Sequence, residues 1–324
     1  MPAANVTIHS SQFPENVRRD LIASLRTRKV NHKFHYDSVR QTQKWLALHQ
    51  AHSPSRTDTD CADTYDRAFV EAVKQISAKQ IHVIGLGCGG GQKDTRLLKL
   101  LASAGREVFY TPSDVSVAMT LVAREAALAV LPEKNIFPLV CDLATADDLA
   151  SCLASDAARL ITFFGMIPNF EPEEILPKLA ALVRPQDYLL FSANLAPGAD
   201  YAAGMEKIFP QYNNALTRDW LMAFLLGLGV ETGDGELRFT IESGAANLQR
   251  VVARFHFTRN CCLVMDSEQF KFRSGESIQL FFSYRYTPEL VQQNLAQHEL
   301  AVRSEWLTKS PEEGVFLCQR VGKS

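Results

Sequence analysis

A dense group of glycines follows a short apolar segment in the first third of the chain. Five of the seven residues from Gly85 to Gly91 are glycine, the largely apolar segment 81–84 precedes them, and apolar residues resume at Leu97. This order predicts a strand, a tight turn and a helix. Because glycine has no Cβ, backbone N–H groups in such a turn can approach a ligand at the helix N-terminus. We therefore expect the turn to hold a nucleotide-like cofactor.

The spacing of these glycines leaves two cofactors open. Gly85-x-Gly87-x-x-Gly90 satisfies the dinucleotide fingerprint, whereas Gly87-x-Gly89 satisfies the looser pattern of S-adenosylmethionine sites. The glycine turn alone is therefore compatible with an NAD-dependent oxidoreductase and with a methyltransferase.

Polar side chains follow the next three predicted strands. The segment 107–114 ends in Asp114, which suits two ribose hydroxyls, and 136–142 ends in Asp142, which suits an adenine amino group. The segment 160–165 is followed by Asn169. Parallel strands deliver their carboxyl ends to one crevice, so this series favours a class I methyltransferase over a dehydrogenase. Taken singly, each of these side chains could instead cap the helix that follows it.

Lys93 lies near the start of the predicted helix, where the helix dipole disfavours a cation. An anionic partner is therefore favoured for Lys93 over a plain surface position. His49 and His52, followed by Cys61, lack a fourth ligand at the spacing of a metal site. We expect no bound metal.

Two kinds of secondary structure are expected in different parts of the chain. From about residue 57 to 195, helix-like and strand-like segments alternate, which predicts a doubly wound parallel α/β sheet. A helix is then expected over 212–230, and the tail 314–321 is a predicted strand that could re-enter the first sheet. Between them, segments of period two predict antiparallel strands, with breaks at 233–235 and 274–275. These segments are 236–242, 250–257, 262–265 and 277–286.

The composition excludes several classes of partner. The formal net charge is only −2, which argues against a nucleic acid or an anionic membrane surface. No apolar run is long enough to span a membrane, and residues 1–8 do not have the pattern of an export signal. Seven cysteines without a Cys-x-x-Cys pair fit a reduced, cytoplasmic protein. We expect a monomer or a weak dimer that acts on a small molecule.

Six short sequence blocks occur in order between residues 33 and 286, and the similarity that they mark extends from about residue 33 to residue 318. They are 33–37, 53–57, 85–93, 113–116, 169–174 and 275–286. Together these blocks resemble the histidine-specific methyltransferase family, which includes the ergothioneine-pathway enzyme and the fungal dimethylallyltryptophan N-methyltransferases.

The resemblance implies transfer of methyl groups from S-adenosylmethionine to the α-amino nitrogen of a free amino acid or a close derivative. It implies a Rossmann-like methyltransferase domain, residues 57–196 and 287–324, and a smaller α+β substrate-binding domain, residues 1–56 and 197–286. By position, it assigns the cofactor to Gly85, Gly87, Gly89, Lys93, Asp114, Asp142 and Leu143. It assigns the substrate to Tyr36, Ser53, Asn169, Tyr212, Phe239, Phe281 and Ser283, with Tyr36 and Asn169 as the catalytic residues.

Within these assignments, Lys93 would pair with the cofactor carboxylate, Asp114 would bind the ribose, and Asp142 with Leu143 would frame the adenine. A sulfonium methyl is already an activated electrophile. The enzyme would therefore mainly align a neutral amine and exclude water.

The substrate positions depart from the family. Phe281 stands where the histidine enzyme has a glutamate that accepts a hydrogen bond from the imidazole, and Phe239 aligns with a methionine near the side-chain pocket. His52 or Ser53 replaces one tyrosine of the family, and Tyr212 is the candidate for another. A buried imidazole left without an acceptor costs about 1–3 kcal/mol, whereas aromatic stacking contributes about 0.5–1.5 kcal/mol.

We therefore expect an acceptor with an apolar or aromatic side chain rather than histidine. Two other hypotheses stay open from the sequence. One is the NAD-dependent oxidoreductase, and the other is a non-catalytic relative that binds the cofactor or an amino acid without turnover.

Overall fold

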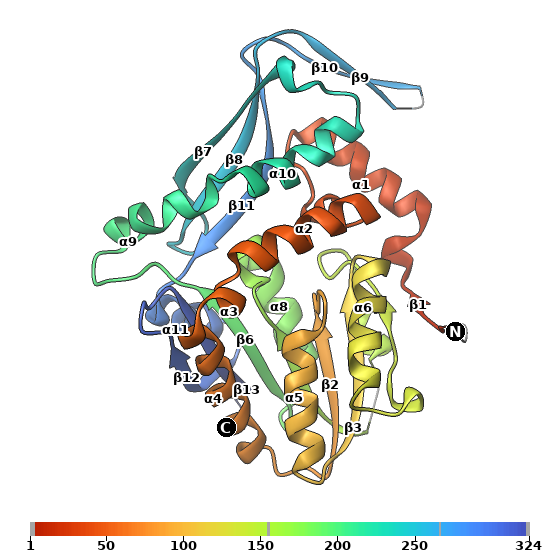
Figure 1. Ribbon diagram of the computed structural model, residues 1–324, viewed down its shortest axis with the longest axis vertical. Helices are drawn as coiled ribbons and strands as arrows, with labels where there is room; N and C mark the ends of the chain where they lie inside the picture. The colour runs from red at the N-terminus through yellow and green to blue at the C-terminus, as the bar shows by residue number, and fades with distance from the viewer. Residues whose placement is uncertain (1–3, 154–155, 266, 322–324) are drawn as a thin grey trace.

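An eight-stranded sheet forms the larger part of the computed structural model, which describes residues 4–153, 156–265 and 267–321 (Figure 1). Its order is β1-β4-β3-β2-β5-β6-β13-β12. The strands are β1 (Thr7–Ile8), β2 (Gln80–Leu86), β3 (Glu107–Asp114), β4 (Leu139–Val140), β5 (Ala158–Phe163), β6 (Tyr188–Asn194), β12 (Leu300–Leu307) and β13 (Glu313–Arg320). The six strands from β1 to β6 run parallel, β13 is antiparallel to β6, and β12 is antiparallel to β13. The predicted doubly wound sheet is therefore confirmed, and the tail strand does re-enter it.

Helices cover both faces of this sheet because its central strands are apolar on both faces. In β2, Ile81 and Val83 pack with residues of α4 (Thr59–Gln75) and α5 (Gln92–Ser103). Ile84 and Leu86 point the other way and pack with α7 (Leu149–Cys152), α8 (Pro172–Leu182) and α11 (Pro288–Ala296). Helix α6 (Val117–Leu128) follows β3 and packs against it. This layering leaves the carboxyl ends of the parallel strands free to build a site.

A smaller antiparallel sheet with the order β11-β8-β7 forms the second part of the molecule. Its strands are β7 (Gly235–Ser243), β8 (Gln249–Phe257) and β11 (Ser277–Arg285), and a separate pair is formed by β9 (Cys261–Met265) and β10 (Glu268–Phe272). The helices of this part are α1 (Pro14–Thr27), α2 (Val39–His52), α9 (Tyr201–Ile208) and α10 (Ala215–Gly227), and the short helix α3 (Pro54–Thr57) connects α2 to α4 and contacts both. One apolar cluster joins the N-terminal segment, α10 and the small sheet. In Figure 1 this part lies above the large sheet.

Short 3₁₀ helices complete the described secondary structure. They are η1 (Ser10–Gln12), η2 (His32–His35), η3 (Glu133–Asn135), η4 (Ile167–Asn169), η5 (Phe209–Tyr212) and η6 (Thr232–Asp234). The segment 233–235, predicted as a hairpin break, instead lies at the end of η6 and the start of β7.

Two other local differences from the sequence prediction have physical reasons. The strand predicted over 136–142 is reduced to β4, because Ile136 forms only an isolated bridge and Pro138 has no N–H to donate to a ladder. Thr7 and Ile8 pair with β4, so this part of the N-terminal segment lies in the large sheet. The domain boundaries themselves stay a prediction, and residues 1–3, 154–155, 266 and 322–324 lie outside the described residues.

Candidate active site

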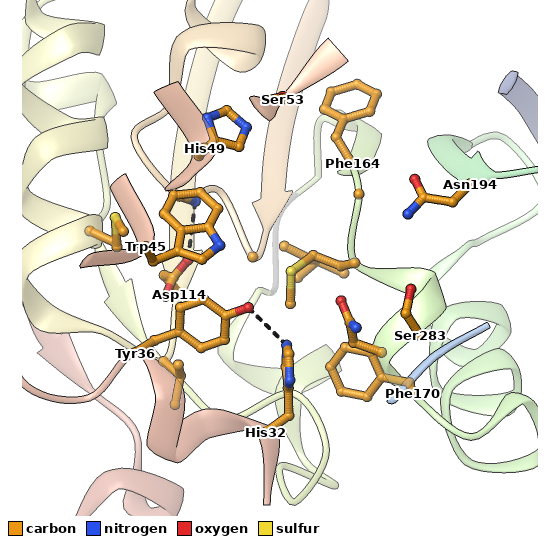
Figure 2. Close-up of a pocket in the computed structure, with 18 of the residues that line it drawn as sticks. His32, Tyr36, Trp45, His49, Ser53, Asp114, Phe164, Phe170, Asn194 and Ser283 are labelled. Carbon is orange, nitrogen blue, oxygen red and sulfur yellow. Dashed lines mark hydrogen bonds between the residues drawn. The ribbon is translucent and has the colours of Figure 1, made fainter. Parts of the chain in front are cut away.

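A cavity of about 780 Å³ lies between the carboxyl ends of the parallel strands and the small sheet. It is lined by the loop after β2, the ends of β3 and β5, helix α2 and strand β11. Figure 2 shows Trp45, Tyr36 and Asp114 on one side of it and Phe170, Ser283 and Asn194 on the other. All the predicted site residues line this cavity except Gly85 and Phe239.

The glycine turn brings its backbone close to the cavity. Gly87 and Gly89 have φ angles of +60° and +52°, and Gly91 (φ +71°) stands at the start of α5. A Cβ on Gly87 would lie 2.7 Å from Cγ of Met166, and a Cβ on Gly89 would lie 3.3 Å from the indole of Trp45. Only glycine fits these positions without displacement, as a cradle for a nucleotide requires.

Gly85 has a different role. It lies within β2, and a Cβ there would collide with the carboxylate of Asp94. Asp94 in turn accepts hydrogen bonds from Tyr110 Oη at 2.7 Å and Thr162 Oγ1 at 2.8 Å. Gly85 therefore allows the close approach of α5 to the sheet and does not face the cavity.

Asp114, at the end of β3, holds the glycine turn in place. Its Oδ2 accepts a hydrogen bond from the backbone N–H of Gly89 at 3.0 Å, and its Oδ1 accepts one from Ser116 at 2.9 Å. Burial raises the pKa of Asp114 to about 6. A carboxylate held in this way at the cavity wall could accept hydrogen bonds from the hydroxyl groups of a ribose.

Asp142, after β4, is held by the N-terminal segment. The ammonium Nζ of Lys33 lies 3.1 Å from Oδ2 of Asp142 and 2.6 Å from Oδ2 of Asp20. The backbone N–H of Ala144 donates to Asp142 Oδ1 at 3.0 Å. Asp142 and Leu143 both line the cavity.

Lys93 has partners within the protein that the sequence did not reveal. Its Nζ donates to Tyr65 Oη at 2.7 Å and lies 4.0 Å from Oε1 of Glu313, to which Tyr65 also donates. Burial lowers the pKa of Lys93, and the carboxylate of Glu313 opposes that effect. The ammonium lines the cavity near the glycine turn, where a carboxylate of a ligand could join it.

Tyr36 is paired with a histidine that sequence reasoning missed. Its Oη lies 3.0 Å from Nε2 of His32, and the two rings meet edge to face at 4.9 Å (Figure 2). Burial and the neighbouring His35 lower the pKa of His32 to about 3, so the imidazole is neutral near pH 7. A phenol hydroxyl can then donate to this nitrogen and turn its lone pairs toward the cavity.

Asn169, the last residue of η4, connects the end of β5 to the small sheet. Its Nδ2 donates to the carbonyl oxygen of Phe282 in β11 at 2.8 Å. Its Oδ1 accepts no hydrogen bond from the described residues. The side-chain amide is therefore oriented with its acceptor available to a bound group.

Tyr212 and Ser283, predicted separately, are in direct contact. Tyr212 Oη donates to Ser283 Oγ at 2.9 Å and accepts from Nε of Arg285 at 3.0 Å. Ser283 is 2% exposed and lies on β11, whereas Tyr212 comes from η5. The structure thus brings the candidate tyrosine to the strand that carries the serine.

An aromatic wall surrounds Phe281. Its ring lies 5.8 Å from Trp220, 6.0 Å from His32 and 6.4 Å from Tyr212. Phe239 is not part of this wall, since it packs on β7 beneath the guanidinium of Arg218, 5.5 Å from its ring centre. The structure therefore places only one of the two predicted phenylalanines against the cavity.

The remaining predicted and unpredicted lining residues come from helices far apart in the chain. Ser53 joins α2 to α3 and lines the cavity near Trp45 and His49, whose rings stack at 4.8 Å. Sequence reasoning missed His32, Trp45, Phe170, Trp220 and Arg285. Of these, Phe170 lies inside the block 169–174, Arg285 lies inside the block 275–286 and His32 directly precedes the block 33–37, so these three could have been inferred from the chain.

A group of potential metal ligands lies elsewhere. His9, Asp148 and Cys152 come together outside the cavity lining. Both ring nitrogens of His9 are already engaged, with Nδ1 accepting from Ser11 N at 3.1 Å and Nε2 lying 2.7 Å from Asp148 Oδ1. Separately, among the described residues no helix is both long and apolar enough to cross a membrane.

The sheet order, the glycine cradle and the acidic strand ends define a Rossmann-like, S-adenosylmethionine-dependent methyltransferase. The chain belongs to the family described as histidine-specific methyltransferase, SAM-dependent, which matches residues 17–320. Membership decides between the two cofactors that the glycine spacing left open, in favour of S-adenosylmethionine.

Solved structures of methyltransferases are similar to this chain at low sequence identity. The methyltransferase CcbJ of Streptomyces caelestis is 14% identical, with 80% of this chain and 94% of that chain covered and a TM-score of 0.41. The 1,6-didemethyltoxoflavin-N1-methyltransferase of Burkholderia thailandensis is 10% identical, with 87% and 89% covered and a TM-score of 0.43. An amino pentose methyltransferase of Micromonospora echinaspora is 16% identical, with 86% and 96% covered and a TM-score of 0.40. No curated protein sequence matches the chain.

Proposed function

We propose that this methyltransferase transfers methyl groups to the α-amino nitrogen of a free amino acid or amino-acid derivative whose side chain is apolar or aromatic rather than imidazole. The cofactor supplies an electrophilic methyl group, so the residues of the chain need to align a neutral amine and keep water out. Gly87, Gly89, Asp114 and Asp142 would hold the nucleoside, and Lys93 would meet the cofactor carboxylate.

The observation that carries the proposal is the hydrogen bond from Asn169 Nδ2 to the carbonyl oxygen of Phe282, 2.8 Å. Since the amide donor is occupied, the acceptor Oδ1 is the part of Asn169 offered to the cavity. An amine that donates one N–H to this oxygen is held with its lone pair free for attack. Burial also disfavours the charged ammonium form, which helps the amine to bind as the neutral nucleophile.

The aromatic wall supports the choice of side chain. Phe281 offers an apolar face where an imidazole would need a hydrogen-bond acceptor, and Trp220 lies 5.8 Å from it. A flat apolar or aromatic side chain gains contact area there and leaves no polar group unpaired. Tyr36, Tyr212, Ser53 and Ser283 would surround the polar end of the same acceptor.

Turnover with a panel of amino acids tests this function. Phenylalanine, tyrosine, tryptophan, leucine, arginine and histidine are supplied with S-adenosylmethionine, and methylated products are measured by mass spectrometry together with S-adenosylhomocysteine. We expect an apolar or aromatic amino acid to react fastest. A preference for histidine would refute the assignment of Phe281.

The Asn169→Ala variant tests the role of the amide. Turnover should fall by about 100-fold or more, as is usual when a positioning contact to the reacting group is lost, with little change in affinity for S-adenosylhomocysteine. Asn135→Ala is the matched control, because Asn135 also donates its Nδ2 to a backbone carbonyl at 3.0 Å but lies outside the cavity. Equal turnover in both variants would remove Asn169 from the site.

We also propose that the protein acts in the cytoplasm as a monomer or weak dimer. All seven cysteines are free thiols, which supports a reducing compartment. Light scattering over a range of protein concentrations measures the oligomeric state, and a stable higher oligomer would contradict it.

A further inference from the structure

Arg285 is a buried cation that has no ionic partner among the described residues. It is the last residue of β11, is 6% exposed and lines the cavity. The described residues form no ion pair with its guanidinium, although neighbouring arginines of the small sheet do have acidic partners, such as Glu242 for Arg254. Leaving a charge in the protein interior without a counter-charge is costly, so such a group usually serves a ligand or a network.

The hydrogen bonds of Arg285 leave one edge of the guanidinium unused. Nε donates to Tyr212 Oη at 3.0 Å, and Nη1 donates to the carbonyl oxygens of Leu195 at 3.1 Å and Glu312 at 3.4 Å. No described residue accepts a hydrogen bond from Nη2. Nη2 is not one of the fully buried polar atoms without a hydrogen-bond partner, and the Arg285 side chain lines the cavity. Nη2 is therefore accessible to a ligand there.

These bonds fix the direction of the free edge. Leu195 follows β6 and Glu312 precedes β13, so the guanidinium is anchored on the large sheet while its backbone belongs to the small one. Its other contact, Tyr212, donates in turn to Ser283 Oγ at 2.9 Å. A rigid guanidinium next to two hydroxyl groups is suited to a planar anion that can accept more than one hydrogen bond.

We propose that Arg285 binds the carboxylate of the methyl acceptor and makes the enzyme selective for amines that carry a carboxylate. The inference rests on the proposed function for the identity of the acceptor. Two carboxylates could in principle reach this cavity, that of the acceptor and that of the cofactor. Arg285 is assigned to the acceptor because it donates to Tyr212, which donates in turn to Ser283 on β11, the strand that carries the proposed acceptor-binding residues Phe281 and Ser283. The glycine turn has its own cation in Lys93, at the start of α5.

Paired acceptors test the assignment. Each of the six amino acids above is compared with its carboxamide, which has the same side chain and amine but no negative charge. We expect the wild-type protein to have a higher kcat/KM for the acid than for the carboxamide. In Arg285→Gln, the acid-to-amide ratio of kcat/KM should fall by about tenfold or more. Arg285→Lys keeps the charge but not the fork of donors, and should retain part of the preference. The ratio of acid to amide is the decisive quantity, since a purely structural role of Arg285 would lower both activities together.

The matched control is Arg254→Gln, which removes a guanidinium from β8 that is paired with Glu242 and does not line the cavity. Its acid-to-amide ratio should equal that of the wild type. Calorimetry with S-adenosylhomocysteine, run on every variant, establishes that the protein is folded and shows whether the cofactor is affected.

The outcomes separate this inference from the proposed function. If acids are methylated and the ratio is unchanged in Arg285→Gln, the function stands and the role of Arg285 is refuted. The same conclusion follows if Arg285→Gln weakens S-adenosylhomocysteine binding about tenfold while the ratio stays constant, because the guanidinium would then serve the cofactor. If neither acid nor amide reacts although S-adenosylhomocysteine binds, the proposed function fails and the inference fails with it.

Discussion

The ammonium of Lys33 lies 3.1 Å from the carboxylate of Asp142, and this ion pair joins the N-terminal segment to the cavity-lining edge of the large sheet. The side chain of Lys33 is only 2% exposed and that of Asp142 only 6%. Asp20, on α1, lies 2.6 Å from the same ammonium on its other side. The segment that carries His32 and Tyr36 is therefore fixed relative to the wall proposed to bind adenine.

The Lys33→Met variant should destabilise the protein, because it leaves two acidic side chains facing each other without their shared cation. We expect the free energy of unfolding to fall by about 3 kcal/mol, as when one member of a buried pair is removed. Lys74→Met is the control. Lys74 pairs with Glu71 on the exposed surface of α4 and should cost less than about 1 kcal/mol. Urea denaturation measures the free energy of unfolding of both variants. Equal losses would show that the buried ion pair of Lys33 contributes no more to stability than the exposed pair of Lys74.

The pKa of Asp114 predicts how cofactor affinity changes with pH. Burial raises this pKa to about 6, and ribose hydroxyls that donate hydrogen bonds favour the charged carboxylate. Binding therefore releases a proton below pH 6. Affinity for S-adenosylhomocysteine should be full above this pH and weaken as the pH falls through it, by up to about tenfold per unit.

Calorimetry from pH 5 to pH 8 measures this dependence, and Asp114→Asn should weaken binding at pH 8 and flatten the curve. Asp94 also lines the cavity and has its pKa raised to about 6 by burial, so a smaller residual slope is expected. Identical curves for the wild type and Asp114→Asn would exclude Asp114 as the titrating group.

The parts of the site that could be predicted from the sequence are short and contiguous. Gly87 and Gly89 lie in one turn, and Asp114 directly ends a strand whose apolar pattern is clear. Local sequence determines such features because the strand, the turn and the helix are consecutive. The parallel topology then requires their polar ends to meet at one edge of the sheet.

The parts that could not be predicted depend on pairing between distant residues. The sequence predicts an anionic ligand as the partner of Lys93, yet Tyr65 and Glu313 of the protein itself already contact its ammonium. These two residues are 248 positions apart in the chain, so no local pattern brings them together. Strand β1 has only two residues and no pattern of its own, so only its pairing with β4 identifies it.

Phe239 illustrates a limit of alignment within strands. Successive side chains of a strand point to opposite faces, so the alignment must be correct to a single residue for a strand position to face the cavity. In β7, Phe239 contacts the Arg218 guanidinium and the clusters around α9 and α10. The direction of this side chain follows from tertiary packing that the sequence pattern does not contain.

The glycine turn predicts a difference between two alanine variants. Gly87 and Gly105 both have positive φ angles, +60° and +72°, so alanine at either position should cost about 1–2 kcal/mol of stability. A Cβ on Gly105 meets nothing within 4 Å, whereas one on Gly87 meets Met166 at 2.7 Å. Only Gly87→Ala should therefore weaken S-adenosylhomocysteine binding, by about tenfold or more. Comparable affinities of the two variants would contradict the cradle.

The identity of Phe281 predicts a change in acceptor when a carboxylate replaces the ring. In the Phe281→Glu variant, the new carboxylate lies in the wall next to Trp220 and His32 and can accept a hydrogen bond from an imidazole N–H. A hydrogen bond to a charged group contributes about 1.5–3 kcal/mol, so KM for histidine should fall about tenfold or more relative to the wild type. In the same variant, KM for the best aromatic acceptor should rise relative to the wild type, because the apolar face of the Phe281 ring is lost. The assay is best run near pH 8, since burial raises the pKa of a glutamate.

Phe239→Glu is the matched control, as it places the same carboxylate on β7 outside the cavity and should leave the acceptor preference unchanged. If Phe281→Glu accepts histidine no better than Phe239→Glu does, the wall around Phe281 does not select the acceptor side chain.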